Sequence, residues 1–180
     1  MIQNNRIKLI YQITILVFSL VLQYTAVRHV SLLGVRPNLP LVAIIAIGIA
    51  SGPEPAALAG FILGLYQDSV SGKILGMYAL FYLYVGVIAG LLSKRNSMKS
   101  LPASIVMTYV LSAVTEVSIY LFGYVIPILR SGHTPNASFF YALGRIIPIA
   151  SLMNAVLAIF YYLLFKSRKK KETEQSYHVV

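Results

Sequence analysis

Six long apolar stretches, separated by short polar segments, constrain the fold of this chain more than any other feature. They span residues 9–27, 39–51, 56–68, 74–92, 101–129 and 139–165. Only 11% of the 180 residues are Lys, Arg, Asp or Glu, whereas a soluble domain carries roughly 25%. So few charges cannot cover a water-facing surface. The sequence therefore predicts an all-α membrane protein, a bundle of about six transmembrane helices in a single domain over residues 1–165.

The second and third stretches are short for membrane spans. Each has 13 residues and rises only about 20 Å as a helix, against a hydrocarbon core of roughly 30 Å. Gly52-Pro53-Glu54-Pro55 separates them, and two prolines disfavour one continuous helix. We expect either two tilted spans or two half-helices of a re-entrant hairpin, and both arrangements leave the termini on the same side of the membrane.

The basic residues predict the orientation in the membrane. The net charge of +10 at pH 7 would suit nucleic-acid binding, but these residues cluster between and after the apolar stretches, which indicates a topology signal and no nucleic-acid partner. With the N-terminus in the cytoplasm, the ten on the inner side are Arg6, Lys8, Lys94, Arg95, Lys99, Lys166, Arg168, Lys169, Lys170 and Lys171. The four on the outer side are Arg28, Arg36, Lys73 and Arg130. This bias predicts that both termini are cytoplasmic.

The last fifteen residues, 166–180, are expected to form a basic, disordered cytoplasmic tail. Five cations lie within residues 166–171. We interpret this cluster mainly as a topology anchor, with contact to anionic membrane lipids as the alternative.

Two ionisable residues lie inside the last two apolar stretches. Glu116 is near the middle of 101–129, and Arg145 is in the outer part of 139–165. A charge at the bilayer centre costs roughly 2.5–3.5 kcal/mol, so each needs a partner. Because a short loop joins the two spans, they are expected to be antiparallel neighbours, and Glu116 and Arg145 are a candidate intramembrane ion pair. A structural role is favoured over a proton or substrate relay.

Small residues recur at helical spacing in the third and fourth stretches. These candidate helix-packing residues are Ala56, Gly60, Gly64, Gly86 and Gly90. Spacing by four places small side chains on one face, where membrane helices approach closely.

Asp68 continues the first of these rows. At a helix C-terminus the dipole disfavours a carboxylate. Asp68 therefore needs a partner: Lys73, Arg145 or the backbone N–H groups of residues 69–72. We expect it to organise this outer turn.

No motif indicates catalysis. The chain lacks Gly-x-Ser-x-Gly, His-Glu-x-x-His and the phosphate-binding Gly-x-x-x-x-Gly-Lys-Ser, and it has no Cys. His29 and His133 both fall in expected outer loops, but two His without Cys make a weak metal site. The sequence therefore predicts no catalytic residue, no metal site and no cofactor.

Two segments resemble a known family. They are Arg36-Pro37-Asn38-Leu39 and Gly60-x-x-x-Gly64-Leu65-x-x-Asp68-x-x-Ser71-Gly72-x-x-Leu75-Gly76. Their order and spacing are similar to those of the bacterial rod shape-determining protein MreD. Asn38 departs from the pattern, because Asp is expected there in many members.

The resemblance implies a helical fold like that of the substrate-binding components of energy-coupling-factor vitamin transporters, and no enzymatic activity. It implies a scaffold of the cell-elongation machinery in the bacterial inner membrane, supporting lateral peptidoglycan synthesis. The implied partners are MreC, RodA, a class-B penicillin-binding protein and, indirectly, MreB filaments. The candidate partner-binding residues, in the outer half, are Arg36, Pro37, Asp68, Ser71, Gly72 and Gly76.

Two other functions remain open. One is a vitamin-binding transporter component, since the implied fold is shared. The Ala-x-x-x-Ala docking motif expected of such components is missing from 9–27, which holds only Ala26. The other is a proton-coupled channel or carrier that uses Asp68 and Glu116.

Overall fold

The computed structural model describes residues 2–25, 31, 34–71, 75–94, 100–131 and 141–177. Within these ranges the chain forms six helices: α1 (Ile2–Thr25), α2 (Leu39–Ser51), α3 (Pro53–Ser71), α4 (Met77–Leu92), α5 (Leu101–Ser131) and α7 (Ile147–Tyr177). A π-helical turn, η2 (Ala142–Ile146), leads into α7. The prediction of an all-α bundle of about six helices is confirmed.

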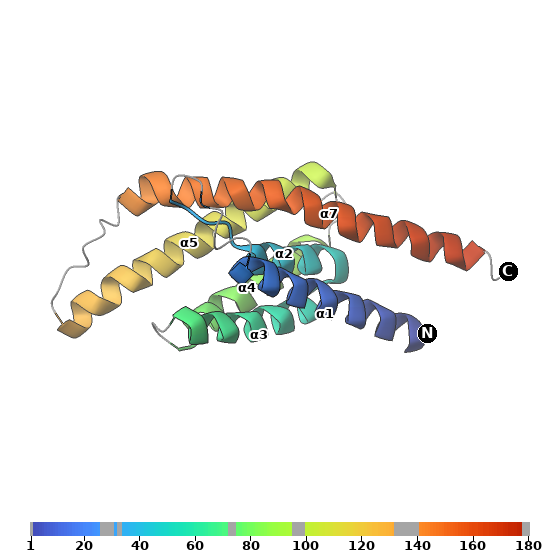
Figure 1. The fold of residues 1–180 in the computed structure, drawn as a ribbon, viewed down its shortest axis with the longest axis horizontal. Helices are drawn as coiled ribbons and strands as arrows, with labels where there is room; N and C mark the ends of the chain where they lie inside the picture. Colours follow the sequence, from blue (N-terminus) through green and yellow to red (C-terminus); the bar gives the residue numbers. More distant parts are fainter. Residues whose placement is uncertain are drawn as a thin grey trace.

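The short helix α2 lies at the centre of the bundle. It contacts α1, α3, α4, α5 and α7 (Figure 1). Its buried residues are Leu39, Pro40, Leu41, Val42, Ala43, Ile44, Ile45, Ile47 and Gly48. A helix that is apolar on every side has to be surrounded, and α2 is enclosed mainly by other helices of the same chain.

Gly52 separates α2 from α3. Its φ of 99° lies in the region that favours glycine, and its N–H donates to the Gly48 carbonyl. Pro53 then starts α3, because the first helical position needs no N–H. The expected break between the second and third stretches is therefore present, and α3 begins three residues before the apolar stretch that predicted it.

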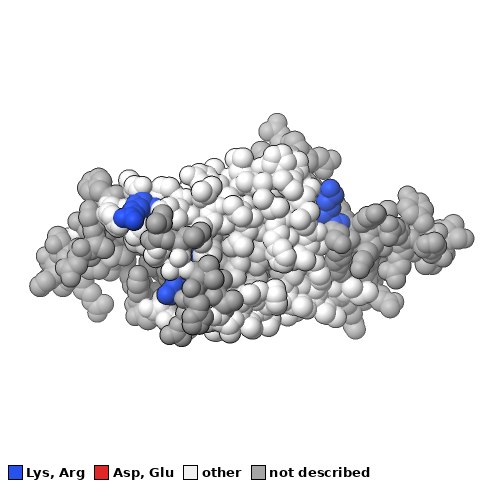
Figure 2. All heavy atoms as spheres, turned by 45° about the horizontal axis from the view of Figure 1, so that its top comes forward, with Lys and Arg blue, Asp and Glu red and all other residues white. Residues whose placement is uncertain are grey.

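The outer surface of the bundle is apolar. Three helical segments are long and apolar enough to cross a membrane: Ile7–Thr25, Leu101–Gly123 and Leu143–Lys166. Large hydrophobic side chains are exposed along α1, α3, α5 and α7, among them Phe18, Leu58, Val106 and Val156. On the face shown in Figure 2, the basic residues lie toward the two ends and leave an uncharged central band. This surface is that of a membrane protein.

Both chain ends lie at the same end of the molecule (Figure 1). The helix α7 continues to Tyr177, whereas the sequence analysis expected a disordered segment from residue 166. Lys, Arg, Glu and Gln dominate residues 166–175, and these residues have high helix propensity, so they extend the helix in which the sixth stretch already lies.

The turn η2 precedes a proline. Pro148 has no N–H, so it cannot donate the bond to the Gly144 carbonyl that an α-helix requires at this point. The wider turn over Ala142–Ile146 accommodates this missing bond.

Candidate functional site

The backbones of α3 and α4 approach each other closely at four glycines. A Cβ at Gly60 would lie within 3.0 Å of the Tyr82 carbonyl, and one at Gly64 equally close to the Ala79 backbone. Gly86 faces the Ala56 carbonyl, and Gly90 faces the backbone of Pro53, in the same way. The structure thus places all five predicted small residues at one helix–helix contact.

Asp68 lies at the end of α3 and caps the start of α4. Its side chain is only 4% exposed. Oδ2 accepts hydrogen bonds from the N–H groups of Gly76 (3.0 Å) and Ala79 (3.1 Å), and Oδ1 accepts one from Tyr78 (2.9 Å). The first N–H groups of a helix lack partners within the helix and carry a partial positive charge, so a carboxylate is well suited to this position.

The partners of Asp68 differ in position from the expected ones. One of the three expected kinds of partner was backbone N–H groups, and the observed partners are of this kind. They belong to the start of α4, however, and not to residues 69–72. Gly76 makes this possible, because its φ of 95° turns the chain toward α3 before α4 begins. Gly72 and Lys73 lie outside the described residues.

Asn38 joins three helices, α2, α4 and α7, through its backbone and side chain, and reaches α5 through Asn154. Its Oδ1 caps α2 by accepting from Leu41 N–H, and its Nδ2 donates to the Tyr82 hydroxyl of α4 at 2.6 Å. Its backbone N–H donates to Oδ1 of Asn154 on α7, whose Nδ2 donates to Ser112 on α5. The side chains of Tyr82, Asn154 and Ser112 are fully buried. We call these residues the Asn38 network.

The Asn38 network explains why Asn is acceptable where the family pattern favours Asp. Asn38→Asp keeps the capping oxygen and accepts a hydrogen bond from the Tyr82 hydroxyl, whereas Asn38→Ala removes both bonds. We expect Asn38→Ala to lower stability by about 1–3 kcal/mol, and Asn38→Asp to lower it by less. Thermal unfolding in detergent checks this; equal losses in the two variants would contradict the proposed role of the side-chain oxygen.

Residues from α1 complete this end of the bundle. Gln23 donates to the Pro37 carbonyl and accepts from Leu39 N–H. The Tyr24 hydroxyl donates to Gln67 of α3 at 2.8 Å. The segment before α2 is therefore joined by hydrogen bonds to α1, α4 and α7. We call this part of the bundle, formed by Gln23, Tyr24, residues 36–38, 67–71 and 75–76, the Asp68 end.

The candidate partner-binding residues that the structure describes all lie at the Asp68 end. Arg36 is exposed, Pro37 is buried, and Ser71 and Gly76 are half-buried. Next to Gly76, Leu75 is 82% exposed, the highest value among the exposed large hydrophobic residues. In the sequence, Leu75 is recognisable only as part of a motif, because a helical pattern does not reveal which side of a turn a residue occupies.

The structure gives Arg145 a neighbour on its own helix. Its Nη1 donates to the Tyr141 hydroxyl at 2.8 Å, and its guanidinium carbon lies 5.6 Å from the centre of that ring. Glu116 is half-buried on α5 and interacts electrostatically with Tyr78, Tyr82 and Tyr120. The Glu116–Arg145 ion pair stays a prediction.

The helix α5 carries a row of polar residues that was not predicted from the sequence. It consists of Ser104, Thr108, Ser112 and Thr115, which are all buried. The helices α5 and α7 pack together, and Ser112 bonds to Asn154 across this contact. The spacing of small residues by about four was visible in the sequence, and it is the same signal that identified the glycine rows.

Groups of metal-binding side chains are absent from the described part of the chain: no three His, Asp or Glu side chains lie together there. His29 and His133 lie outside the described residues. Both carboxylate oxygens of Asp68 already accept hydrogen bonds from backbone N–H groups. The arrangement at the Asp68 end is suited to holding helices in place.

Comparison with known proteins identifies the family. The comparisons with curated proteins and with solved structures found no match, so the likeness to vitamin-transporter components stays a prediction. A family model described as rod shape-determining protein MreD matches residues 4–169, which is nearly the whole chain and includes the Asp68 end. The chain therefore belongs to the MreD family, and its role is in the determination of rod shape.

Proposed function

We propose that this chain is a non-catalytic membrane scaffold of the bacterial cell-elongation machinery. It binds MreC at the Asp68 end and so helps to maintain lateral peptidoglycan synthesis, together with RodA, a class-B penicillin-binding protein and, indirectly, MreB filaments. The observation that carries the proposal is the construction of the Asp68 end. There, partly buried hydrogen bonds of Asp68 and Asn38 join α2, α3, α4 and α7 next to exposed residues.

The proposed orientation places the Asp68 end outside the cytoplasm, in the bacterial inner membrane. Lys8 on α1, Lys94 after α4 and Lys166 on α7 lie at the opposite end, which we call the Lys8 end. Both chain ends lie at the Lys8 end as well (Figure 1). Basic residues favour the cytoplasmic side, so the Lys8 end is assigned to the cytoplasm.

Two exposed side chains make the Asp68 end suitable for a partner that contains one transmembrane helix and an adjoining extracytoplasmic segment. Leu75 presents an apolar side chain, and Arg36 presents a positive charge. Each residue precedes a helix whose start is fixed by a capping side chain: Arg36 precedes α2, capped by Asn38, and Leu75 precedes α4, capped by Asp68. A partner therefore meets a surface that loses little conformational entropy on binding.

Variants at the two exposed positions test the proposal. Arg36→Glu and Leu75→Asp change exposed side chains. The variant proteins are therefore expected to fold and to reach the membrane. Co-purification with MreC is expected to fall at least about fivefold for each, as is usual for a central contact worth more than about 1 kcal/mol. Lys94→Glu, at the opposite end, is the matched control.

The outcomes of this experiment separate the alternatives. Unchanged MreC yield in both variants, with rod shape preserved, would remove the Asp68 end as the MreC site. A stoichiometric vitamin found with the purified protein by an untargeted ligand screen would instead favour the function of a transporter component.

A further inference from the structure

A pocket of about 310 Å³ opens at the Lys8 end between α1, α2, α5 and α7. Its walls are apolar where the four helices meet, with Val42, Ala46 and Ile49 from α2 and Ala158 and Phe165 from α7. This volume is at the lower end of the roughly 300–1,000 Å³ typical of small-molecule pockets. It is large enough for part of one acyl chain and too small for a whole phospholipid.

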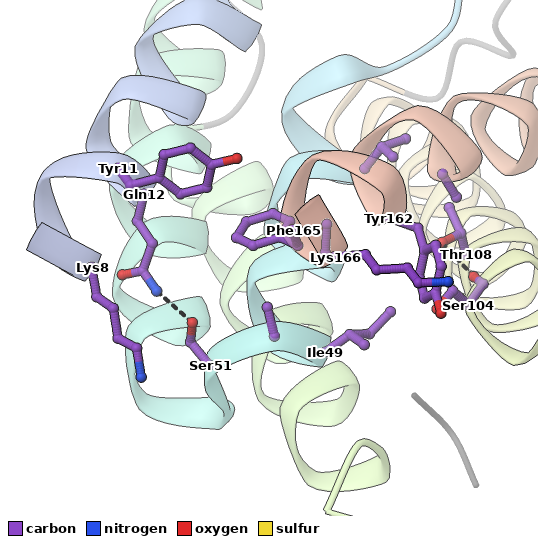
Figure 3. A pocket seen from close by; sticks show the side chains of 14 residues that line it. Lys8, Tyr11, Gln12, Ile49, Ser51, Ser104, Thr108, Tyr162, Phe165 and Lys166 are labelled. Atoms are coloured by element: carbon purple, nitrogen blue, oxygen red, sulfur yellow. Dashed lines mark hydrogen bonds between the residues drawn. The ribbon is translucent and has the colours of Figure 1, made fainter. Parts of the chain in front are cut away.

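The two charged residues among the described lining of the pocket are both lysines. Lys8 extends from α1 and Lys166 from α7, on opposite sides of the pocket (Figure 3). Both side chains are exposed, and the ammonium of Lys166 lies 6.0 Å from the centre of the Tyr162 ring. None of the lining residues that the structure describes is acidic. A ligand that reaches both lysines therefore needs a negative group.

Polar groups line the pocket beside the lysines. The Gln12 side chain donates to the Ser51 hydroxyl, joining α1 to the end of α2 (Figure 3). On α5, the Ser104 hydroxyl donates to the Ser100 carbonyl and the Thr108 hydroxyl to the Ser104 carbonyl, so both hydroxyl oxygens can still accept hydrogen bonds. The pocket thus combines cations and hydroxyls with an apolar interior, and it lies where two membrane-spanning segments, Ile7–Thr25 and Leu143–Lys166, reach their ends.

We propose that this pocket binds an anionic phospholipid, with its phosphate near Lys8 and Lys166 and the upper part of one acyl chain against Ala46, Ile49 and Phe165. Lysine binds phosphate as a point charge, and lysines at helix ends lie at the level of the lipid headgroups. The apolar walls then contact the chain of the same lipid. This site does not depend on MreC binding, and failure of either proposal leaves the other standing.

Native mass spectrometry of the full chain tests the site. The purified protein is freed of lipid and mixed with equal amounts of phosphatidylglycerol and phosphatidylcholine of the same chain length. We expect one phosphatidylglycerol per chain, retained about tenfold more than phosphatidylcholine. Lys8→Gln combined with Lys166→Gln is expected to remove this preference, since the attraction of basic residues to anionic lipid is electrostatic.

Three variants and one competitor make the result decisive. Lys94→Gln, at the same end but outside the pocket, is expected to bind as before, and so is Lys8→Arg with Lys166→Arg, which keeps both charges. Ala50→Phe, which narrows the pocket without changing charge, is expected to reduce binding. Equal retention of the two lipids, an equal loss in Lys94→Gln, or displacement by glycerol 3-phosphate, the soluble headgroup alone, would each overturn the proposal.

Discussion

Gly64→Ala is expected to destabilise the protein more than almost any other single-methyl change. A Cβ at residue 64 would collide with the backbone of Ala79, and backbone atoms cannot move aside as a flexible side chain can. Overpacking costs roughly 1–3 kcal/mol in ordinary cores, and a backbone clash is expected at the upper end of that range or above it. Gly60→Ala, which meets the Tyr82 carbonyl, is expected to behave in the same way.

Gly123→Ala is the matched control for these variants. Gly123 lies on α5, and a Cβ there would meet nothing within 4 Å. Because alanine is the better helix former, this variant is expected to be neutral or to gain about 0.5–1 kcal/mol. Thermal unfolding in detergent, followed by fluorescence-detected size exclusion of a tagged protein, compares the three. Equal stability of Gly64→Ala and Gly123→Ala would show that α3 and α4 are not packed as described.

Asp68→Ala is expected to have the second large effect. The substitution leaves three backbone N–H groups, those of Gly76, Tyr78 and Ala79, without their acceptor. A buried unsatisfied donor costs about 1–3 kcal/mol. The Ala79 bond is buried and the other two are partly buried, so a loss of about 3 kcal/mol is expected, together with loss of rod shape in cells that depend on this protein.

Asp68→Asn distinguishes the contributions of the two carboxylate oxygens to stability. An amide keeps one oxygen as an acceptor, and the best placement retains the two bonds that Oδ2 now accepts. Its stability is therefore expected to lie between those of the wild type and Asp68→Ala. Glu54→Gln, an exposed carboxylate at the start of the same helix, is the control and is expected to change stability by less than about 0.5 kcal/mol. Equal effects at residues 54 and 68 would contradict the capping role.

The helices were predictable from the sequence because their signals are local. The apolar stretches and the Gly52-Pro53 break predict α2, α3, α4 and α5 within about three residues, whereas α1 begins earlier and α7 ends later than predicted. The glycine rows were also visible, because a spacing of four places Gly60 and Gly64 on the same face whatever the partner helix is.

The contacts between distant segments were not predictable in this way. The sequence required a partner for Asp68 but did not identify it, because the position of the α4 N–H groups depends on the left-handed Gly76. The role of Asn38 depends on Tyr82 and Asn154, which are 44 and 116 residues away. Such contacts follow from how the helices pack, and no spacing in one sequence contains them.

The packing also gives the scaffold proposal its physical basis. The central helix α2 contacts five other helices, and the cap of α4 and the Asn38 network lie at one end of them. A body built in this way presents partners with surfaces whose relative positions change little. Under the scaffold proposal, such a body holds partners at its two ends in a fixed relative position.

Site-specific photo-crosslinking in the native host tests the central claim most directly. A photo-reactive amino acid replaces Leu75 at the Asp68 end or, in a second strain, Lys94 at the Lys8 end, and the products are probed for MreC. The account predicts an MreC adduct from position 75 and none from position 94. An adduct from position 94 alone, or none from position 75 in cells that remain rod-shaped, would contradict it.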